Sequence, residues 1–101
     1  MHVLVAEDDR RLASFLQKGF QEKGLVADVA TDGEQAAMLA MTGLYDAVVL
    51  DLMLPVRSGF DVIRQLRAEG VRTPIICLTA RDRLNDRVAA LWATRWNRST
   101  G

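Results

Sequence analysis

The feature that most constrains the fold is a regular alternation between short apolar runs and longer segments of helical periodicity. Apolar runs lie at residues 3–6, 26–30, 47–51 and 75–78. Runs that lack polar alternation are typical of strands buried on both faces. Because strands joined through helices of this length form right-handed crossovers, the alternation predicts a single α/β domain with a parallel sheet.

The segments between these runs carry start and stop signals for helices. Thr31 and Glu34 form a candidate capping box before the second helix, and Ser58 and Asp61 form a similar pair before the third. Glycines at positions 24, 43 and 70 follow the three segments as stop signals. Apolar residues at helical spacing mark one stripe in the first helix and one in the third, namely Leu12, Phe15, Leu16, Gly19 and Phe20, and Phe60, Ile63 and Leu66. A fourth helix is expected from about Leu84, with an apolar face of Val88, Leu91 and Trp92.

Composition narrows the classes of protein that fit. The 101 residues allow one domain, and 13 basic residues balance 13 acidic ones, so no net charge favours direct binding to nucleic acid or to an anionic membrane. A secretion signal and a long apolar span are both missing from the sequence, and the single Cys77 cannot form an internal disulfide. We therefore expect a cytoplasmic protein with a buried structural thiol. His2, the sole histidine, is expected to lie exposed on the first strand.

Acidic residues follow two of the predicted strands. Glu7 and Asp8 come directly after the first strand, and Asp51 ends the third. Because parallel strands bring like ends to one edge of a sheet, we expect the three carboxylates to converge, and two carboxylates ~4 Å apart repel by about 4 kcal/mol at an effective dielectric constant of ~20. A bound Mg²⁺ ion would relieve that repulsion. The alternative is that Glu7, Asp8 and Asp9 simply cap the first helix, which leaves Asp51 unexplained.

Three stretches, "VLVAEDD", "DAVVLDLMLPVRSGFDVIRQLR" and "TPIICLTARD", resemble the receiver domain of bacterial two-component response regulators, in particular its OmpR/PhoB branch. The resemblance covers about residues 2–91. It implies a flavodoxin-like, doubly wound parallel sheet with strand order 2-1-3-4. It also implies a phosphoacceptor module of a signalling system rather than an enzyme, with a sensor histidine kinase as partner.

The resemblance implies a role for each matching residue. Asp51 would be the phosphoacceptor, a carboxylate that takes a phosphoryl group from a phosphohistidine of the kinase. Mg²⁺ would be held by Glu7, Asp8 and Asp51 together with the backbone carbonyl of Met53. Thr79 would be the switch hydroxyl that turns toward the phosphoryl group, and Ala80 the small neighbour that leaves it room.

The resemblance ends at about residue 91, where the chain reads "WATRWNRSTG" instead of a Gly-rich turn, a fifth strand, a Lys-Pro pair and a fifth helix. Residues 1–91 are thus predicted to form an incomplete receiver, and residues 92–101 a non-matching tail that continues the fourth helix. The only lysines, Lys18 and Lys23, fall in the first helix, so the cation that the family places beside the phosphoryl group has no counterpart unless Arg81 replaces it. Phosphorylation is therefore expected to be impaired. No DNA-binding effector domain is expected in the chain.

Two further function classes stay open at this stage. One is a Mg²⁺-dependent phosphatase with an aspartyl nucleophile, as in haloacid dehalogenase-like enzymes, although these carry a second acid at the position of Met53. The other is an inert pseudo-receiver that only dimerises or binds a partner. Without a fifth strand, the fourth would be an edge strand, so we expect a homo-oligomer formed through that strand, the fourth helix and the tail with Trp92 and Trp96.

Overall fold

The computed structural model of the chain describes residues 1–78, and strands and helices alternate throughout this part. The elements are β1 (His2–Ala6), α1 (Arg10–Glu22), β2 (Val26–Ala30), α2 (Gly33–Ala40), β3 (Ala47–Asp51), α3 (Gly59–Ala68) and β4 (Ile75–Leu78). The predicted fourth helix, the tail and the question of a fifth strand lie outside the described residues. Within residues 1–78, no helix is both long and apolar enough to cross a lipid bilayer.

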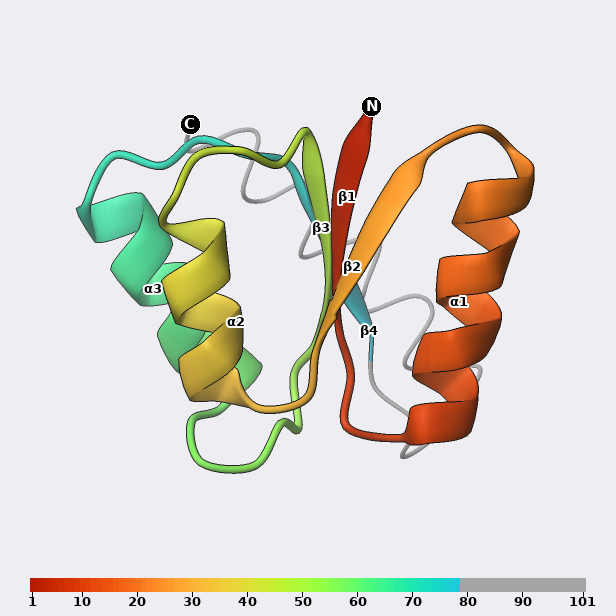
Figure 1. Ribbon diagram of the computed structural model, residues 1–101. Coiled ribbons are helices and arrows are strands. Elements are labelled where there is room, and N and C mark those ends of the chain that lie inside the picture. The colour runs from red at the N-terminus through yellow and green to blue at the C-terminus, as the bar shows by residue number, and fades with distance from the viewer. Residues whose placement is uncertain (79–101) are drawn as a thin grey trace.

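The four strands form one parallel sheet in the order β2-β1-β3-β4, which confirms the predicted order. Helix α1 covers one face of the sheet, and helices α2 and α3 cover the other (Figure 1). The register places Ala6 of β1 beside Leu50 of β3, so the residues that follow these two positions leave the sheet at the same edge. That arrangement confirms the parallel α/β sheet predicted from the alternation and the doubly wound topology that the resemblance implied.

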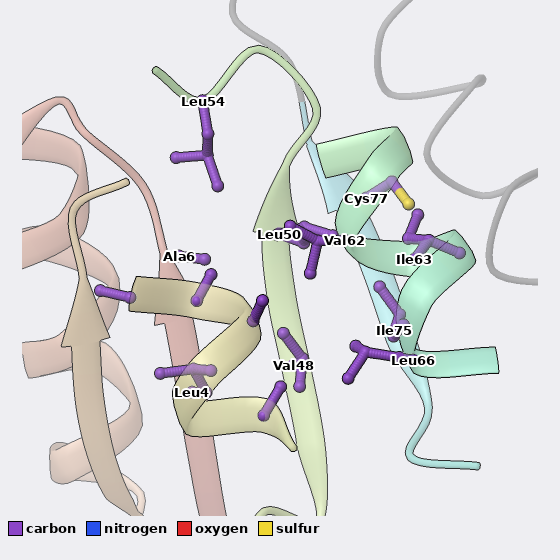
Figure 2. Close-up of a cluster of buried hydrophobic side chains, with 14 of the residues drawn as sticks. Leu4, Ala6, Val48, Leu50, Leu54, Val62, Ile63, Leu66, Ile75 and Cys77 are labelled. Carbon is purple, nitrogen blue, oxygen red and sulfur yellow. The ribbon is translucent and has the colours of Figure 1, made fainter. Parts of the chain in front are cut away.

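Two apolar layers explain why the strands show no polar alternation. On the side of α2 and α3, Leu4 and Leu50 are fully buried in a cluster that also contains Val62 and Leu66 of α3 (Figure 2). On the side of α1, a smaller cluster forms from Val3, Val5 and Val49 with Leu16 and Phe20 packed against it. Neighbouring strand residues point to opposite faces, so a strand covered on both sides is apolar at every position.

Cys77 belongs to the larger apolar cluster, and its predicted burial is confirmed. Burial raises the pKa of its thiol to about 11. The thiol is therefore protonated and unreactive at neutral pH, which agrees with a structural role.

The apolar stripes of two helices are narrower than predicted. Phe15 is 73% exposed, because the face of α1 that meets the sheet runs through Ala13, Leu16 and Phe20, and Phe15 lies beside that line. Phe60 is 51% exposed for the same reason. The buried face of α3 starts one residue earlier and consists of Gly59, Val62, Ile63 and Leu66.

The helix cap was predicted correctly for α3 but not for α2. Helix α2 is capped by Asp32, whose carboxylate accepts the N–H of Gln35 at 2.7 Å. The side-chain oxygen of Gln35 in turn accepts the N–H of Thr31 at 2.8 Å, so the reciprocal pair involves Gln35 rather than Glu34. Ser58 caps α3 as predicted, by accepting the N–H of Asp61 at 3.2 Å.

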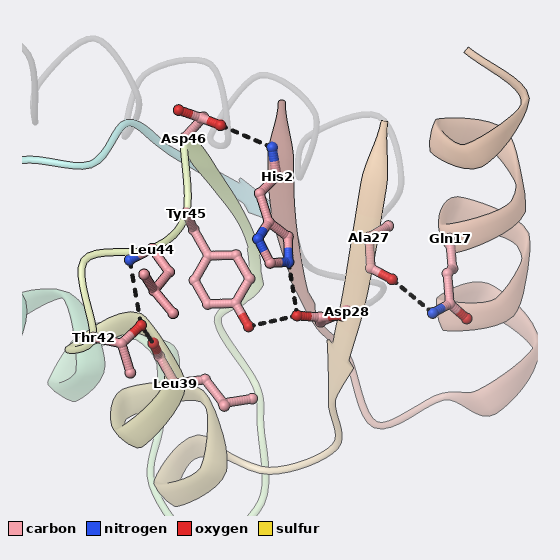
Figure 3. Close-up of polar contacts among 9 residues, drawn as sticks. All are labelled: His2, Gln17, Ala27, Asp28, Leu39, Thr42, Leu44, Tyr45 and Asp46. Atoms are coloured by element: carbon pink, nitrogen blue, oxygen red, sulfur yellow. Dashed lines mark hydrogen bonds and ion pairs between the residues drawn. The ribbon is translucent and has the colours of Figure 1, made fainter. Parts of the chain in front are cut away.

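His2 is half-buried rather than exposed as predicted, because it joins a polar cluster at the N-terminal end of the strands (Figure 3). Its Nε2 lies 2.9 Å from a carboxylate oxygen of Asp28, which also accepts the hydroxyl of Tyr45 at 2.8 Å. The backbone N–H of His2 donates to Asp46 at 2.8 Å. The cluster therefore ties β1 and β2 to the segment that precedes β3.

Candidate functional site

Three carboxylates meet at the C-terminal edge of the central strands. Glu7 and Asp8 directly follow β1, and Asp51 is the last residue of its neighbour β3. Each side chain offers one carboxylate oxygen, and these oxygens all lie within 4.8 Å of one another. The predicted convergence is confirmed, and it follows from the parallel register of the two strands.

Two of the three carboxylates are buried and anchored by backbone amides. Glu7 is 3% exposed and Asp51 is 4% exposed, whereas Asp8 faces solvent. The carboxylate of Glu7 accepts the N–H of Asp9 at 2.9 Å, and Oδ1 of Asp51 accepts the N–H of Met53 at 2.9 Å. These bonds fix two acidic side chains at the edge of the core, where an uncompensated charge is costly.

Helix capping accounts for only one of the three acids at residues 7–9. Asp9 is the N-cap of α1, and its carboxylate accepts the N–H groups of Arg11 and Leu12 at 3.0 and 3.2 Å. Glu7 and Asp8 instead lie with Asp51. The alternative in which all the acids merely cap the helix is therefore wrong.

The electrostatics of the cluster indicate an excess of negative charge. Burial is the main cause that raises the pKa of Glu7 from 4.5 to about 7; the hydrogen bond from Asp9 opposes this shift, and the nearby carboxylates of Asp51 and Asp8 add to it. The pKa of Asp51 is also raised, chiefly by burial and in part by Asp8, against the lowering effect of hydrogen bonds from Met53 and Glu7. Both shifts mean that a proton or a bound cation would relieve the negative charge of the cluster.

No lysine or arginine among residues 1–78 forms an ion pair with these three carboxylates. Lys18 lies within α1 and Lys23 is the C-cap of that helix, as the sequence predicted for both lysines. The residues therefore fit a hard divalent cation, since they present oxygen donors and negative charge that no described cation balances. Mg²⁺ binds through few protein ligands of this type and keeps several waters.

The loop after Asp51 is packed tightly against the end of the sheet. The N–H of Leu52 donates to the carbonyl of Leu78 at 2.8 Å, and the N–H of Gly59 donates to the carbonyl of Leu52 at 3.0 Å. A Cβ on Gly59 would lie 2.5 Å from the carbonyl oxygen of Asp51, so only glycine fits there. The start of α3 thereby rests directly on the backbone of the candidate nucleophile.

Some predicted site residues are placed by the structure and others are not. Met53 follows Asp51 by two residues, and its backbone N–H faces the Asp51 carboxylate. Thr79, Ala80 and Arg81 lie outside the described residues. Sequence reasoning missed the contact of Gly59 with Asp51, although its signal, a glycine just after the helix-capping Ser58, was visible in "SGFD".

Comparison with known proteins identifies the domain. The sequence model of the response regulator receiver domain matches residues 3–96, and thus reaches past residue 91, where the resemblance was predicted to end. Curated relatives include the transcriptional regulatory protein DltR of Streptococcus agalactiae, the response regulator PmrA of Pseudomonas aeruginosa and the transcriptional regulatory protein CusR of Escherichia coli. Identities over 91 residues, 90% of this chain, are 44%, 44% and 42%. The chain covers only 41%, 41% and 40% of those proteins.

Solved structures agree with the sequence comparison. The receiver domain of the Francisella response regulator 1452 superposes with a TM-score of 0.78 at 36% identity, covering 92% of this chain and 77% of that one. TrrA of Thermotoga maritima, solved in complex with Mg²⁺–BeF, gives a TM-score of 0.76 at 30% identity, with coverages of 95% and 79%. The fold, the order of its strands and the matched sequence agree: this chain belongs to the response regulator receiver domain family of two-component systems.

Proposed function

We propose that the domain accepts a phosphoryl group on Asp51, with Mg²⁺ held by Glu7, Asp8, Asp51 and the backbone carbonyl of Met53. The observation that carries the proposal is the convergence of three carboxylates within 4.8 Å at the edge of β1 and β3, with no described cation beside them. The Mg²⁺–BeF complex of the relative TrrA adds support. The phosphoryl donor is a phosphohistidine on a sensor histidine kinase.

The transfer needs one nucleophile and fixed positive charge. A carboxylate oxygen of Asp51 attacks phosphorus while the P–N bond to the imidazole of the kinase breaks, and the electron pair of that bond stays on the imidazole nitrogen. Mg²⁺, when bound, supplies positive charge to the equatorial phosphoryl oxygens. The hydrogen bond from the Met53 N–H to Oδ1 holds the Asp51 carboxylate in a fixed orientation. The resemblance to the family supports Thr79 as the residue whose hydroxyl would contact the phosphoryl group.

Within residues 1–78, no positive charge lies beside the proposed phosphoryl site. Lys18 and Lys23 belong to α1 and its C-cap, and neither forms an ion pair with the carboxylate cluster. Arg81 is a candidate to supply this charge, although its planar guanidinium is no geometric equivalent of a lysine.

For the homo-oligomer predicted from the sequence, we propose that β4 forms the contact between two copies of the chain. Ile76 on this strand is 43% exposed, and β4 ends the strand order of the described sheet. An apolar side chain on the outermost strand of the described sheet favours pairing with another chain. Light scattering over a hundredfold dilution tests this point, and a monomer at every concentration would contradict it.

Phosphorylation is tested with acetyl phosphate and Mg²⁺, followed by intact mass measurement. We expect gain of one phosphoryl group in the parent, none in Asp51→Asn, and a gain equal to that of the parent in the control Asp46→Asn, whose side chain lies at the opposite end of the sheet. Labelling that survives in Asp51→Asn would eliminate Asp51 as the acceptor. Mg²⁺ binding without any labelling, by acetyl phosphate or by a kinase, would favour the pseudo-receiver instead.

A further inference from the structure

The loop between β3 and α3 contains a strained turn. The N–H of Arg57 donates to the carbonyl of Pro55 at 2.8 Å, which closes a three-residue γ-turn around Val56. Val56 has a φ of 72°, a conformation that a β-branched residue rarely adopts. Of the non-glycine residues in the described part, only Val56 has a positive φ. A conformation of this kind persists only when surrounding contacts impose it.

The imposing contact comes from the first residue of α2. The N–H of Gly33 donates to the same Pro55 carbonyl at 3.0 Å. A Cβ on Gly33 would lie 1.9 Å from the carbonyl oxygen of Arg57 and 2.7 Å from its carbonyl carbon. These are backbone atoms, so they cannot move aside as a flexible side chain could. Gly33 thus packs directly on the turn, and its own position is fixed by the adjacent Asp32, which caps α2.

The other end of the loop is held in the same way. A Cβ on Gly59 would lie 2.5 Å from the Asp51 carbonyl oxygen and 2.8 Å from the Cα of Leu52. Between the two glycine contacts runs the segment in which the N–H of Met53 meets the carboxylate of Asp51. Two close backbone contacts therefore bracket the backbone that orients the candidate nucleophile.

We propose that Gly33 is a positioning residue for the phosphoacceptor site. Although it lies on α2 and is no member of the carboxylate cluster, its contact with residues 55–57 sets the path of the loop from Asp51 onward, and with it the orientation of the Met53 backbone. The inference rests on the proposed Mg²⁺ site for its functional meaning. The geometry of the loop can nevertheless be measured without any metal.

The test compares two glycine-to-alanine changes in helices. Gly33→Ala places a methyl group against the Arg57 backbone, whereas Gly19→Ala in α1 meets nothing within 4 Å and serves as the matched control. For both variants and the parent, the amide resonance of Met53 is recorded in metal-free protein, and Mg²⁺ affinity is measured by titration calorimetry. Urea unfolding shows whether each variant is folded under the conditions used.

In Gly33→Ala we expect a shifted Met53 amide resonance and an affinity for Mg²⁺ weakened by about tenfold, the effect of disturbing groups that orient metal ligands. Gly19→Ala should match the parent in both measurements. A folded Gly33→Ala protein with the parent's Met53 resonance and the parent's affinity would overturn the proposal. If the parent binds no Mg²⁺ but the Met53 resonance moves only in Gly33→Ala, the proposed metal site fails while the positioning role stands.

A second variant keeps the proposal testable if Gly33→Ala does not fold. Val56→Gly removes the strain of the turn but leaves the contact from Gly33 in place. If the contact from Gly33 determines the path of the loop, the Mg²⁺ affinity of Val56→Gly should stay within about twofold of that of the parent. A tenfold change would show that Val56 itself determines the loop, and it would overturn the assignment to Gly33.

Discussion

Replacing Asp8 by asparagine should act in opposite directions with and without Mg²⁺. The carboxylate oxygens of the cluster lie within 4.8 Å of one another. Two unit charges at that distance repel by about 1 kcal/mol in water and by about 3.5 kcal/mol at an effective dielectric constant of ~20. Asp8 is exposed, so the lower figure applies. In metal-free buffer, Asp8→Asn should therefore raise the free energy of unfolding by about 1 kcal/mol.

Mg²⁺ should reverse the order of stability. At ten times its dissociation constant, a ligand that binds only the folded state adds about 1.4 kcal/mol. The parent should gain this amount, and Asp8→Asn should gain little at the same concentration because it has lost a charged ligand. The control is Asp9→Asn, since asparagine caps a helix as well as aspartate does and Asp9 is outside the cluster.

Urea unfolding with and without Mg²⁺ measures both effects. The result that refutes the reasoning is an Asp8→Asn protein that is less stable than the parent without metal, since repulsion would then not dominate. An equal response to Mg²⁺ in Asp8→Asn and Asp9→Asn would show that Asp8 is no ligand.

Three further changes probe other parts of the fold. Val56→Gly should raise the free energy of unfolding by about 1 kcal/mol, because relief of a left-handed conformation outweighs the added freedom of the unfolded chain; urea titration that shows no gain would mean that the turn is unstrained. Arg67→Met should lower the free energy of unfolding by about 2 kcal/mol, since the guanidinium donates to two backbone carbonyls of the segment before β4. In the same titration the control Arg64→Met, at an exposed ion pair, should change it by less than about 0.5 kcal/mol. Asp28, whose pKa is lowered from 3.8 chiefly by the hydrogen bond from Tyr45, should contribute stability that is lost as the pH falls below about 4; acid titration of Asp28→Asn should show a shallower loss than the parent.

Most of the fold could be predicted from local patterns because both faces of the sheet are covered. Residues 47–50 carry no polar side chain, as expected for a strand that is buried on both faces. This pattern was enough to predict the strand and its place in a parallel sheet. Two predictions failed in the choice between adjacent residues, one for the buried face of α1 and one for the N-cap of α2. Phe15 and Leu16 are adjacent, and sequence spacing alone did not decide which of them meets the sheet. Asp32 and Thr31 are both good N-caps, and the choice depends on how the chain leaves β2.

The candidate site was predictable where it depends on strand ends and not where it depends on loop packing. Convergence of Glu7 and Asp51 follows from parallel strands, so the sequence pattern sufficed. The contact of Gly33 with residues 55–57 joins segments more than 20 residues apart. No periodicity marks such a contact, and a glycine at the start of a helix has many ordinary explanations. The half-buried state of His2 was missed for the same reason, because its partners Asp28 and Tyr45 lie in other segments.

The charge of the cluster leads to a last prediction, that the metal-free domain loses stability as the pH rises. Burial is the main cause that raises the pKa of Glu7 from 4.5 to about 7, so the folded chain holds this proton more tightly than the unfolded chain. The resulting stabilisation is complete below about pH 4.5 and is lost as the pH rises through 7, with an upper limit of about 3 kcal/mol. At the proposed site Mg²⁺ would bind the deprotonated carboxylate, so added Mg²⁺ should flatten this dependence. Urea unfolding between pH 5 and 8 in the presence of a chelator, with Glu7→Gln beside the parent, isolates the contribution; parallel losses of stability in both proteins would show that Glu7 does not hold the proton.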